Sequence, residues 1–454
     1  MYRAVVLAFL FCLGCSPSAP PPAGLVQDIL PGVDASNPED LIMWQGDMYF
    51  QANDGEFGSE VWRLTSSGLE RVTDIEPESG NAAPSRFFIY DGELYFTALL
   101  DAYGREIWKY DGRTAQRLSD IFPGPDSSSP TDFMEWNDAL YFRANDGSTG
   151  FELWKYENGT FSPAFDVDVG PGSSNPSQLT VFGGQLCYTA QTGAEGTELY
   201  CTDGSTPGLV EDLNPGPSGS RPSELTQLGS TLYFYAYRAD VGTELFSFDG
   251  QGISLVADIN PGEPGSNPRN FAVWEGALYF AASNGVFGHE LWRIEEGGEP
   301  TMLVDLNSGP AAGDPYGFTA FNGELYFVGT DATNGVELRR TDGRDVYLVT
   351  DLHVGPGNSD PANLRVFDDM LYFSARDAQH GAELRRSDGT AVELVIDIWP
   401  GPVGSNPADL TSVDSDRVCF SATAEGIGRE LYCVSKTHTA FPADSEQPAA
   451  EPAG

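Results

Sequence analysis

Paired acidic residues recur along the chain at a spacing that could place two carboxylates side by side. A Gly-x-Glu pattern recurs, and an aspartate followed by Ile, Leu or Val comes 14 to 16 residues after most of its glutamates. The glutamates are Glu60, Glu106, Glu152, Glu198, Glu244, Glu290, Glu337, Glu383 and Glu430. The aspartates are Asp28, Asp74, Asp120, Asp168, Asp212, Asp258, Asp305, Asp351 and Asp397. Like charges that face each other across two strands are destabilising, so each pair needs compensation.

Two kinds of chemistry could compensate these carboxylates. In the first, each carboxylate accepts hydrogen bonds from backbone N–H groups of the neighbouring Gly-rich turn or Pro-Gly segment. In the second, some pairs bind Ca²⁺, which takes about 6–8 oxygen ligands, and Asn53-Asp54-Gly55 and its equivalents supply further oxygens. The Ca²⁺ candidates are Glu60, Asp74, Glu106, Asp120, Glu198, Asp212, Glu383 and Asp397. No other cofactor is expected, and the sequence leaves both alternatives open.

Four cysteines form two pairs with the same separation. Cys187 and Cys201 are 14 residues apart, as are Cys419 and Cys433. If the second and third strands of a unit form a hairpin, each pair stands directly opposite, at a distance that modest adjustment brings within reach of a disulfide. We therefore predict two cross-strand disulfides; a pair of metal thiolates is the weaker alternative, because these four cysteines show no Cys-x-x-Cys spacing.

No catalytic constellation is visible in the sequence. The four histidines are His289, His353, His380 and His438. His289 and His380 fall in equivalent turns before the recurring glutamate, where a solvated turn residue is expected. A hydrolytic mechanism would have to use carboxylates, and a carboxylate pair in a carbohydrate-active enzyme remains an alternative. We predict that the protein is not an enzyme.

These residues lie on a unit of about 46 residues that repeats nine times, a length typical of propeller blades. In the third unit we expect strands at Asp132–Trp136, Leu140–Ala144 and Glu152–Tyr156, and a fourth that ends near Asp168. Within a strand such as Leu140–Ala144, apolar side chains point to both sides, so both faces must be covered. A blade between two neighbouring blades meets that need.

The two ends of the repeat region predict a closed ring. The ninth unit lacks its fourth strand, and a matching Leu25-Val26-Gln27-Asp28 segment stands at the start of the first unit. This segment can complete the last blade, so that no strand edge is left open. We predict an all-β fold, a single nine-bladed β-propeller of four-stranded antiparallel blades over residues 25–436. The alternatives are an eight-bladed propeller and an open repeat array.

The third strand of several units resembles the repeat of the ELWxxDGT-repeat proteins, a bacterial family of surface and secreted proteins. The matching segments are Glu106-Ile-Trp-Lys-Tyr-Asp-Gly112, Glu152-Leu-Trp-Lys-Tyr-Glu-Asn-Gly-Thr160, Glu290-Leu-Trp-Arg-Ile294 and Glu383-Leu-Arg-Arg-Ser-Asp-Gly-Thr390. In other units Trp gives way to Tyr200, Phe246, Arg339, Arg385 and Tyr432. The resemblance implies an exported repeat protein and no particular reaction.

The N-terminus predicts export. Arg3 and a short apolar run that ends at Gly14 form a lipoprotein-type signal peptide (residues 1–14), in which Cys15 becomes the acylated N-terminus. A Pro-rich tether (15–24) follows, and residues 437–454 form a Pro- and Ala-rich tail that we expect to be disordered. We expect attachment to the bacterial outer membrane or cell surface through the lipid; simple secretion is the alternative.

The composition restricts the partners. The chain has 24 Lys and Arg against 67 Asp and Glu, for a net charge of −43, which argues against nucleic acid. Contact with a membrane is expected only through the lipid anchor. From these observations we predict a monomeric, surface-anchored binding or scaffold protein that engages a protein or a glycan. A structural protein of the envelope or matrix is a further alternative.

Overall fold

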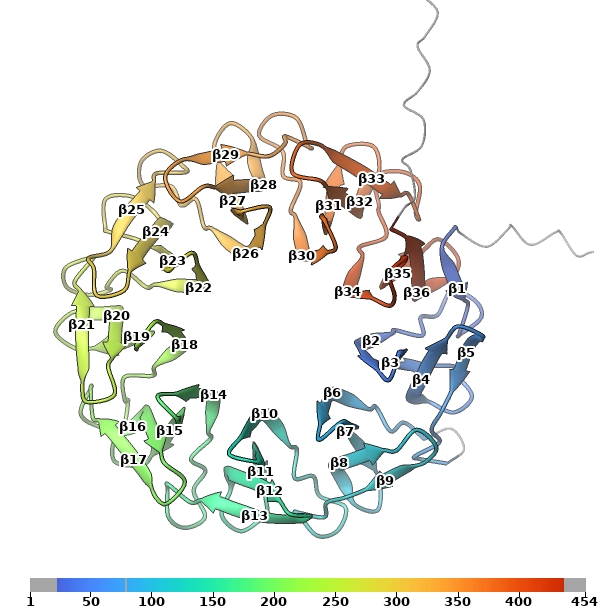
Figure 1. The fold of residues 1–454 in the computed structure, drawn as a ribbon, viewed down its shortest axis with the longest axis horizontal. Helices are drawn as coiled ribbons and strands as arrows, with labels where there is room; N and C mark the ends of the chain where they lie inside the picture. The colour runs from blue at the N-terminus through green and yellow to red at the C-terminus, as the bar shows by residue number, and fades with distance from the viewer. Residues whose placement is uncertain (1–22, 78–79, 437–454) are drawn as a thin grey trace, which may run out of the picture.

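The computed structural model describes residues 23–77 and 80–436, and all regular structure in these residues is β-strand. Nine four-stranded antiparallel sheets surround a central channel as the blades of one propeller (Figure 1). This confirms the predicted nine-bladed ring over the alternatives of eight blades or an open array. The predicted signal peptide, Cys15, most of the tether and the tail lie outside the described residues. No helix that could span a membrane occurs in residues 23–77 and 80–436.

In blades 1 to 8 the strands run in chain order from the channel to the outer edge, and in blade 9 the N-terminal strand β1 is the outer strand (Figure 1). Blades 1 to 3 comprise β2 (Glu39–Trp44), β3 (Asp47–Asn53), β4 (Ser59–Thr65), β5 (Gly68–Arg71); β6 (Ser85–Tyr90), β7 (Glu93–Leu100), β8 (Gly104–Tyr110), β9 (Ala115–Arg117); β10 (Thr131–Trp136), β11 (Ala139–Asn145), β12 (Phe151–Glu157) and β13 (Thr160–Phe165). Blades 4 to 6 comprise β14 (Ser177–Phe182), β15 (Gln185–Thr192), β16 (Gly196–Thr202), β17 (Pro207–Glu211); β18 (Ser223–Leu228), β19 (Thr231–Arg238), β20 (Gly242–Phe248), β21 (Ile253–Ala257); β22 (Arg269–Trp274), β23 (Ala277–Ala282), β24 (Glu290–Glu295) and β25 (Thr301–Val304). Blades 7 to 9 comprise β26 (Tyr316–Phe321), β27 (Glu324–Asp331), β28 (Gly335–Thr341), β29 (Val346–Leu348); β30 (Ala362–Phe367), β31 (Met370–Asp377), β32 (Gly381–Ser387), β33 (Val392–Ile396); β34 (Ala408–Ser412), β35 (Arg417–Ala424), β36 (Gly428–Ser435) and β1 (Leu25–Gln27).

The second strand of each blade distributes its apolar side chains between two neighbours. In β11, Leu140 and Phe142 pack with Tyr95 and Ile107 of blade 2. Tyr141, between them in sequence, packs in the cluster that contains Tyr188 of blade 4. The hydrophobic core therefore consists of layers between blades, and the near-continuous apolar strands predicted from the sequence are buried on both faces.

The hairpin of the second and third strands has the register that the cysteines predicted. Cys187 is directly opposite Cys201, and Cys419 is directly opposite Cys433. Both pairs form disulfides, with a Cα–Cα distance of 4.0 Å in each. The predicted pairing is confirmed.

The N-terminal strand closes the ring. β1 pairs with β36, with Leu25 opposite Tyr432 and Gln27 opposite Leu431. The N–H of Cys433 also donates to the carbonyl oxygen of Gly24 at 2.8 Å. Because β36 would otherwise expose a free edge, this strand pairing is what makes the ring continuous.

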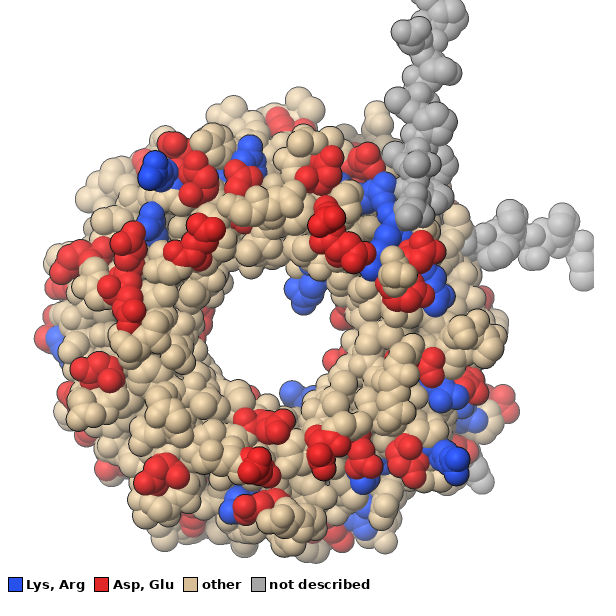
Figure 2. Space-filling view, in the orientation of Figure 1, with Lys and Arg blue, Asp and Glu red and all other residues tan. Residues whose placement is uncertain are grey.

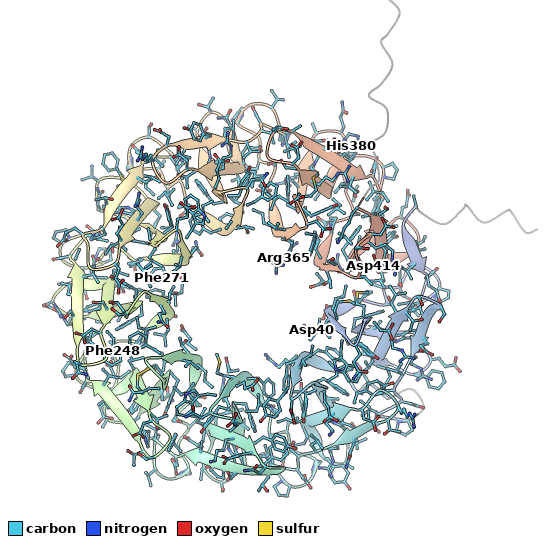
Figure 3. The ribbon with its side chains drawn as sticks, in the orientation of Figure 1. Asp40, Phe248, Phe271, Arg365, His380 and Asp414 are labelled. Atoms are coloured by element: carbon cyan, nitrogen blue, oxygen red, sulfur yellow. A yellow bond between two sulfur atoms is a disulfide. The ribbon has the colours of Figure 1, made fainter. Side chains whose placement is uncertain are left out.

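Hydrogen bonds also join neighbouring blades at the channel. The innermost strands carry a residue with positive φ at equivalent positions, such as Asp40 (56°) and Glu224 (57°). The Asp40 carboxylate accepts the N–H of Arg86 in the next blade at 2.6 Å, and Glu224 accepts the N–H groups of Asn270 and Phe271 at 2.9 and 2.6 Å. Asp40 and Arg365 lie at the edge of the channel (Figure 3), which is open through the ring (Figure 2).

The closure has a direct test. A chain that starts at Ile29 lacks β1 and leaves β36 unpaired, and we expect it to unfold several degrees lower and to self-associate through the free edge. A chain that starts at Ala23 keeps β1 and serves as the control. Thermal unfolding followed by circular dichroism, together with sedimentation velocity, measures both effects; equal stability of the two chains would contradict closure by β1.

Candidate functional site

The recurring glutamates are buried anchors for the segments that connect the blades. Eight of the nine are 0% exposed and Glu152 is 1% exposed. Glu383 is representative: it accepts the N–H groups of Ile398, Trp399 and Ser405 at 3.3, 3.2 and 2.9 Å and the hydroxyl of Ser405 at 2.5 Å. All of these donors lie on the segment that leads to the next blade. Of the two compensations considered from the sequence, hydrogen bonding is the one that these contacts show.

A serine that sequence reasoning missed supplies the hydroxyl donor in most blades. It stands two residues before the proline that closes each unit, so a recurring Ser-x-Pro pattern could have revealed it. The serines that donate a hydroxyl to a glutamate in this way are Ser36, Ser174, Ser220, Ser266, Ser359 and Ser405. In blades 1 and 2 the hydroxyl comes instead from Thr73 and Ser119, which lie earlier in the segment that connects to the next blade.

The glycine of the Gly-x-Glu pattern is required by the same packing. Gly104 has a φ of 65°, and a Cβ atom there would lie 2.1 Å from the carbonyl oxygen of Asp126. The connecting segment therefore passes directly over the glycine before it reaches the glutamate. No other residue type permits both the backbone conformation and the close approach.

The aspartates lie next to the glutamates but are more exposed. The side chains of Asp74 and Asp120 are 46% and 41% exposed. In blade 3 the prediction was wrong: the partner of Glu152 is Asp166, because the N–H of the following Val167 donates to Glu152 at 3.4 Å. Asp168 lies on the connecting segment, where it accepts the N–H of Gly193 at 3.3 Å. The sequence reads Asp166-Val-Asp-Val169 here, so the alignment of the repeated units placed the aspartate two residues too late.

The structure does not gather the Ca²⁺ candidates into a metal centre within residues 23–77 and 80–436. No group of three or more His, Cys, Asp or Glu side chains there could hold a metal ion. The oxygens of Glu60, for example, already accept the hydroxyl of Thr73 at 2.6 Å and the N–H of Ile75 at 3.0 Å. A calcium ion would have to displace these donors.

Burial dominates the titration of the anchors. It raises the pKa of Glu383 to about 7, although the hydrogen bonds from Ser405, Trp399 and Ile398 oppose it. Burial also raises the pKa of Glu60, Glu152, Glu198, Glu244, Glu290, Glu337 and Glu430. Most of the recurring glutamates therefore have a pKa above that of a free glutamate.

The histidines of the described chain do not form a catalytic arrangement with a nucleophile. His380 contacts the carboxylate of Asp377 at 3.0 Å, and His353 contacts the carbonyl oxygen of Asn358 at 3.1 Å. His289, predicted to be solvated, is half-buried, and its Nε2 has no hydrogen-bond partner. None of these three is hydrogen bonded to a serine within the described chain, and His438 lies outside it.

A groove of about 750 Å³ lies between blades 4 and 5, and sequence reasoning missed it. A smaller hollow of about 340 Å³ lies at the equivalent place between blades 8 and 9. The lining of the groove includes Ser177, Thr189 and Thr197 of blade 4 and Ser223, Tyr235 and Thr243 of blade 5. Ser177 and Ser223 start the innermost strands β14 and β18, so the groove opens beside the channel. Another hollow of about 370 Å³, lined in part by Asp168, continues the groove and shares Thr197, Ser218 and Arg221.

Small side chains leave the groove open. The middle residue of Gly-x-Glu is Thr197 in blade 4 and Thr243 in blade 5, so two neighbouring blades both carry a small residue there. Blades 2, 3, 6 and 9 carry Arg105, Phe151, His289 and Arg429, and blades 1, 7 and 8 carry Ser59, Val336 and Ala382. Arg221 lines the groove and is exposed; its Nε donates to the carbonyl oxygen of Ser218 at 3.3 Å. It forms no ion pair within the described residues. The groove thus combines hydroxyl groups, tyrosine rings and an exposed arginine.

No family model matches the sequence, and no curated protein is detectably similar to it. Several solved structures align with the chain at low similarity. A structure from a study of two prolyl endopeptidases aligns over 75% of this chain and 54% of its own, with 12% identity and a TM-score of 0.44. A puromycin hydrolase aligns over 89% and 61%, with 14% identity and a TM-score of 0.39. The β-propeller domain of the Trilobed protease from Pyrococcus furiosus aligns over 70% and 98%, with 12% identity and a TM-score of 0.35.

These findings correct the functional prediction made from the sequence. The sequence predicted a non-catalytic binding or scaffold protein and no enzyme, whereas the similar structures come from peptidases and hydrolases, so that prediction is wrong. The chain spans between half and two thirds of the length of the first two structures, 54% and 61%. At these identities and TM-scores the likeness assigns no activity or substrate to this chain.

The hydrogen bonds to the buried glutamates predict a loss of stability when a hydroxyl donor is removed. Ser405→Ala removes the hydroxyl donor of Glu383, and we expect the free energy of unfolding to fall by about 1–3 kcal/mol, as for a buried acceptor that loses a partner. Ser128→Ala is the matched control, because the Ser128 hydroxyl donates to the carbonyl oxygen of Arg105 and not to Glu106. Urea unfolding compares the two variants; an equal loss in both would show that the serine does not act through the glutamate.

The raised pKa of Glu383 predicts a pH dependence. Between the unfolded pKa of about 4.5 and the folded value of about 7, the folded state binds more protons, so stability falls as the pH rises through this window. We expect urea unfolding at pH 5.5 and pH 7.5 to show this loss, and Glu383→Gln to reduce it. Glu70→Gln, at an exposed carboxylate, should leave the slope unchanged. Stability that rises over the same window would exclude this assignment.

Proposed function

We propose that the ring binds substrate in peptide hydrolysis, and that the groove between blades 4 and 5 holds an extended segment of polypeptide. The observation that carries the proposal is the groove itself, a hollow beside the open channel that is lined by both hydroxyl groups and tyrosine rings. The proposal rests on this groove and not on the low-similarity structures. The hydrolytic groups are assigned to no residue of the described chain.

The lining suits a peptide backbone. Thr197 and Thr243 offer hydroxyl groups that can donate and accept, and Tyr235 offers an aromatic surface. The Arg221 guanidinium can bind a carboxylate with two parallel hydrogen bonds. An extended peptide presents alternating N–H and C=O groups and charged side chains, which match this mixture of partners.

We further infer that the protein is exported, as the signal-like N-terminus and the resemblance to ELWxxDGT-repeat proteins suggest. The two disulfides support export, because such bonds persist in oxidising compartments and are rare in the cytosol. Attachment through an acylated Cys15 is part of the same proposal. Mass spectrometry of the mature N-terminus tests both cleavage and acylation.

A binding experiment tests the groove. Fluorescence anisotropy with fluorescein-labelled, unstructured peptides of mixed sequence should show saturable binding to the intact ring. We expect Arg221→Ala to weaken the binding of acidic peptides about tenfold, since a hydrogen bond to a charged group contributes about 1.5–3 kcal/mol. Arg113→Ala, at an exposed arginine in the turn between β8 and β9, is the control. Equal affinity in both variants, or no binding at all, would overturn the proposal.

A further inference from the structure

Blade 2 shows what one end of the groove is shaped to hold. There Arg105 lies across the first two strands of its own blade. Its Nη1 donates to the carbonyl oxygens of Ala83 and Thr97 at 2.9 and 3.3 Å and to the hydroxyls of Ser85 and Thr97 at 3.2 and 3.3 Å. These partners are all uncharged, and Arg105 forms no ion pair within the described residues. They form a seat for a guanidinium group.

Blade 9 uses the equivalent position in the same way. Arg429 donates to the carbonyl oxygen of Asn406 at 2.9 Å, and to the carbonyl oxygen and hydroxyl of Ser421 at 3.2 and 2.7 Å. Asn406 and Ser421 correspond in the repeat to Ala83 and Thr97 of blade 2. The same seat therefore holds an arginine of the chain twice.

Blade 4 has the seat without the arginine. Ser177, Thr189 and Thr197 stand two units after Ser85, Thr97 and Arg105. The Ser177 and Thr189 hydroxyls are 2.7 Å apart, and Thr189 donates to the carbonyl oxygen of Ser177 at 3.3 Å. In blade 2 the corresponding distances are 3.2 and 3.3 Å. The two hydroxyl acceptors are thus arranged as in blade 2, and Thr197 leaves the place of the long side chain open as the blade 4 end of the groove.

The other blades do not pair a serine with a threonine at this position. Blade 8 pairs Ala362 with Ser374, as blade 9 pairs Ala408 with Ser421, and it has Ala382 where blade 9 has Arg429; there, however, Arg376 of the chain lines the adjoining hollow. The residues paired at the Ser177–Thr189 position are Glu39–Gln51, Thr131–Arg143, Ser223–Tyr235, Arg269–Ala281, Tyr316–Val328, Ala362–Ser374 and Ala408–Ser421. A Ser–Thr pair occurs in blades 2 and 4 alone among the nine described blades. In blade 2 the chain fills the seat itself.

We propose that the blade 4 seat binds the guanidinium group of an arginine side chain in the bound peptide. This rests on the proposed function and names the side chain that the groove selects. The planar guanidinium has fixed donors that match several acceptors at once, which an ammonium group does not reproduce. The net charge of −43 further raises the local concentration of cationic ligands.

The test uses the mature chain and Nα-acetyl-L-arginine amide, which carries the guanidinium without charged ends. Isothermal titration calorimetry should show one site, and the citrulline and lysine analogues should bind at least tenfold more weakly. Thr197→Arg supplies the chain's own guanidinium, so it should abolish binding. Val336→Arg is the control: it adds the same charge at the same repeat position in blade 7, where Tyr316 and Val328 replace the acceptors, and binding should persist.

A converse variant keeps the test independent of folding losses. Arg105→Thr empties the blade 2 seat, and the stoichiometry should rise from one to two. Unchanged binding in Thr197→Arg, or equal binding of citrulline, would overturn the seat. If the amide binds as expected but mixed peptides do not, the seat stands and the proposed function fails. If mixed peptides bind but the amide does not, the groove stands and its selectivity for arginine is lost.

Discussion

A buried glutamate in each blade holds the segment that leads to the next blade, and the ring depends on this contact. A carboxylate removed from water is costly unless donors surround it, and the backbone of the connecting segment supplies those donors. In Glu430 the contact spans the ends of the chain, because its donors are Ile29 and Ser36. The same interaction thus sets the angle between blades and joins the N-terminal segment to the last blade.

This constraint explains why the units are so uniform in length. The donors to a glutamate stand at fixed separations, as in Ile259, Asn260 and Ser266 around Glu244. An insertion between them would move the serine away from the carboxylate. The hydrogen bonds therefore constrain the length of the connecting segments. They place no such constraint on the side chains that face the channel or the groove.

The repeat made the fold predictable, because each landmark recurs in one chain and the cysteines specify the hairpin register. The glutamates were also found, although their serine partners were not: Ser405 and most of its equivalents bond to a glutamate 22 positions away, and Ser36 to one 394 positions away, and a short motif does not show such pairs. The alignment failed at Asp168 because two Asp-Val dipeptides follow one another. The groove could not be predicted, because it depends on Thr197, Ser177 and Thr189, which are separated in sequence and meet on three strands.

Residues that differ between blades at the same repeat position show whether a substitution keeps the hydrogen bonds of that position. At the tryptophan position, Trp62 donates its Nε1 to the carbonyl oxygen of Ala52 at 3.1 Å, and Arg385 donates its Nε to the equivalent oxygen of Ala375 at 3.2 Å. The guanidinium also pairs with Asp377. Burial would raise the pKa of that carboxyl, but hydrogen bonds from His380 and Gln379 and the charge of Arg385 hold it well below its usual range.

The exchange of Trp for Arg is therefore compensated: the hydrogen bond is kept and a new carboxylate satisfies the new charge. The exchange of Arg for Thr at position 197 is not compensated, since the acceptors of the seat remain while the donor is gone. Acceptors retained without their donor are costly if the seat stays dry and are available to a ligand if it does not. In a ring built from one repeated unit, such an uncompensated exchange is the feature that separates a binding site from a structural variation.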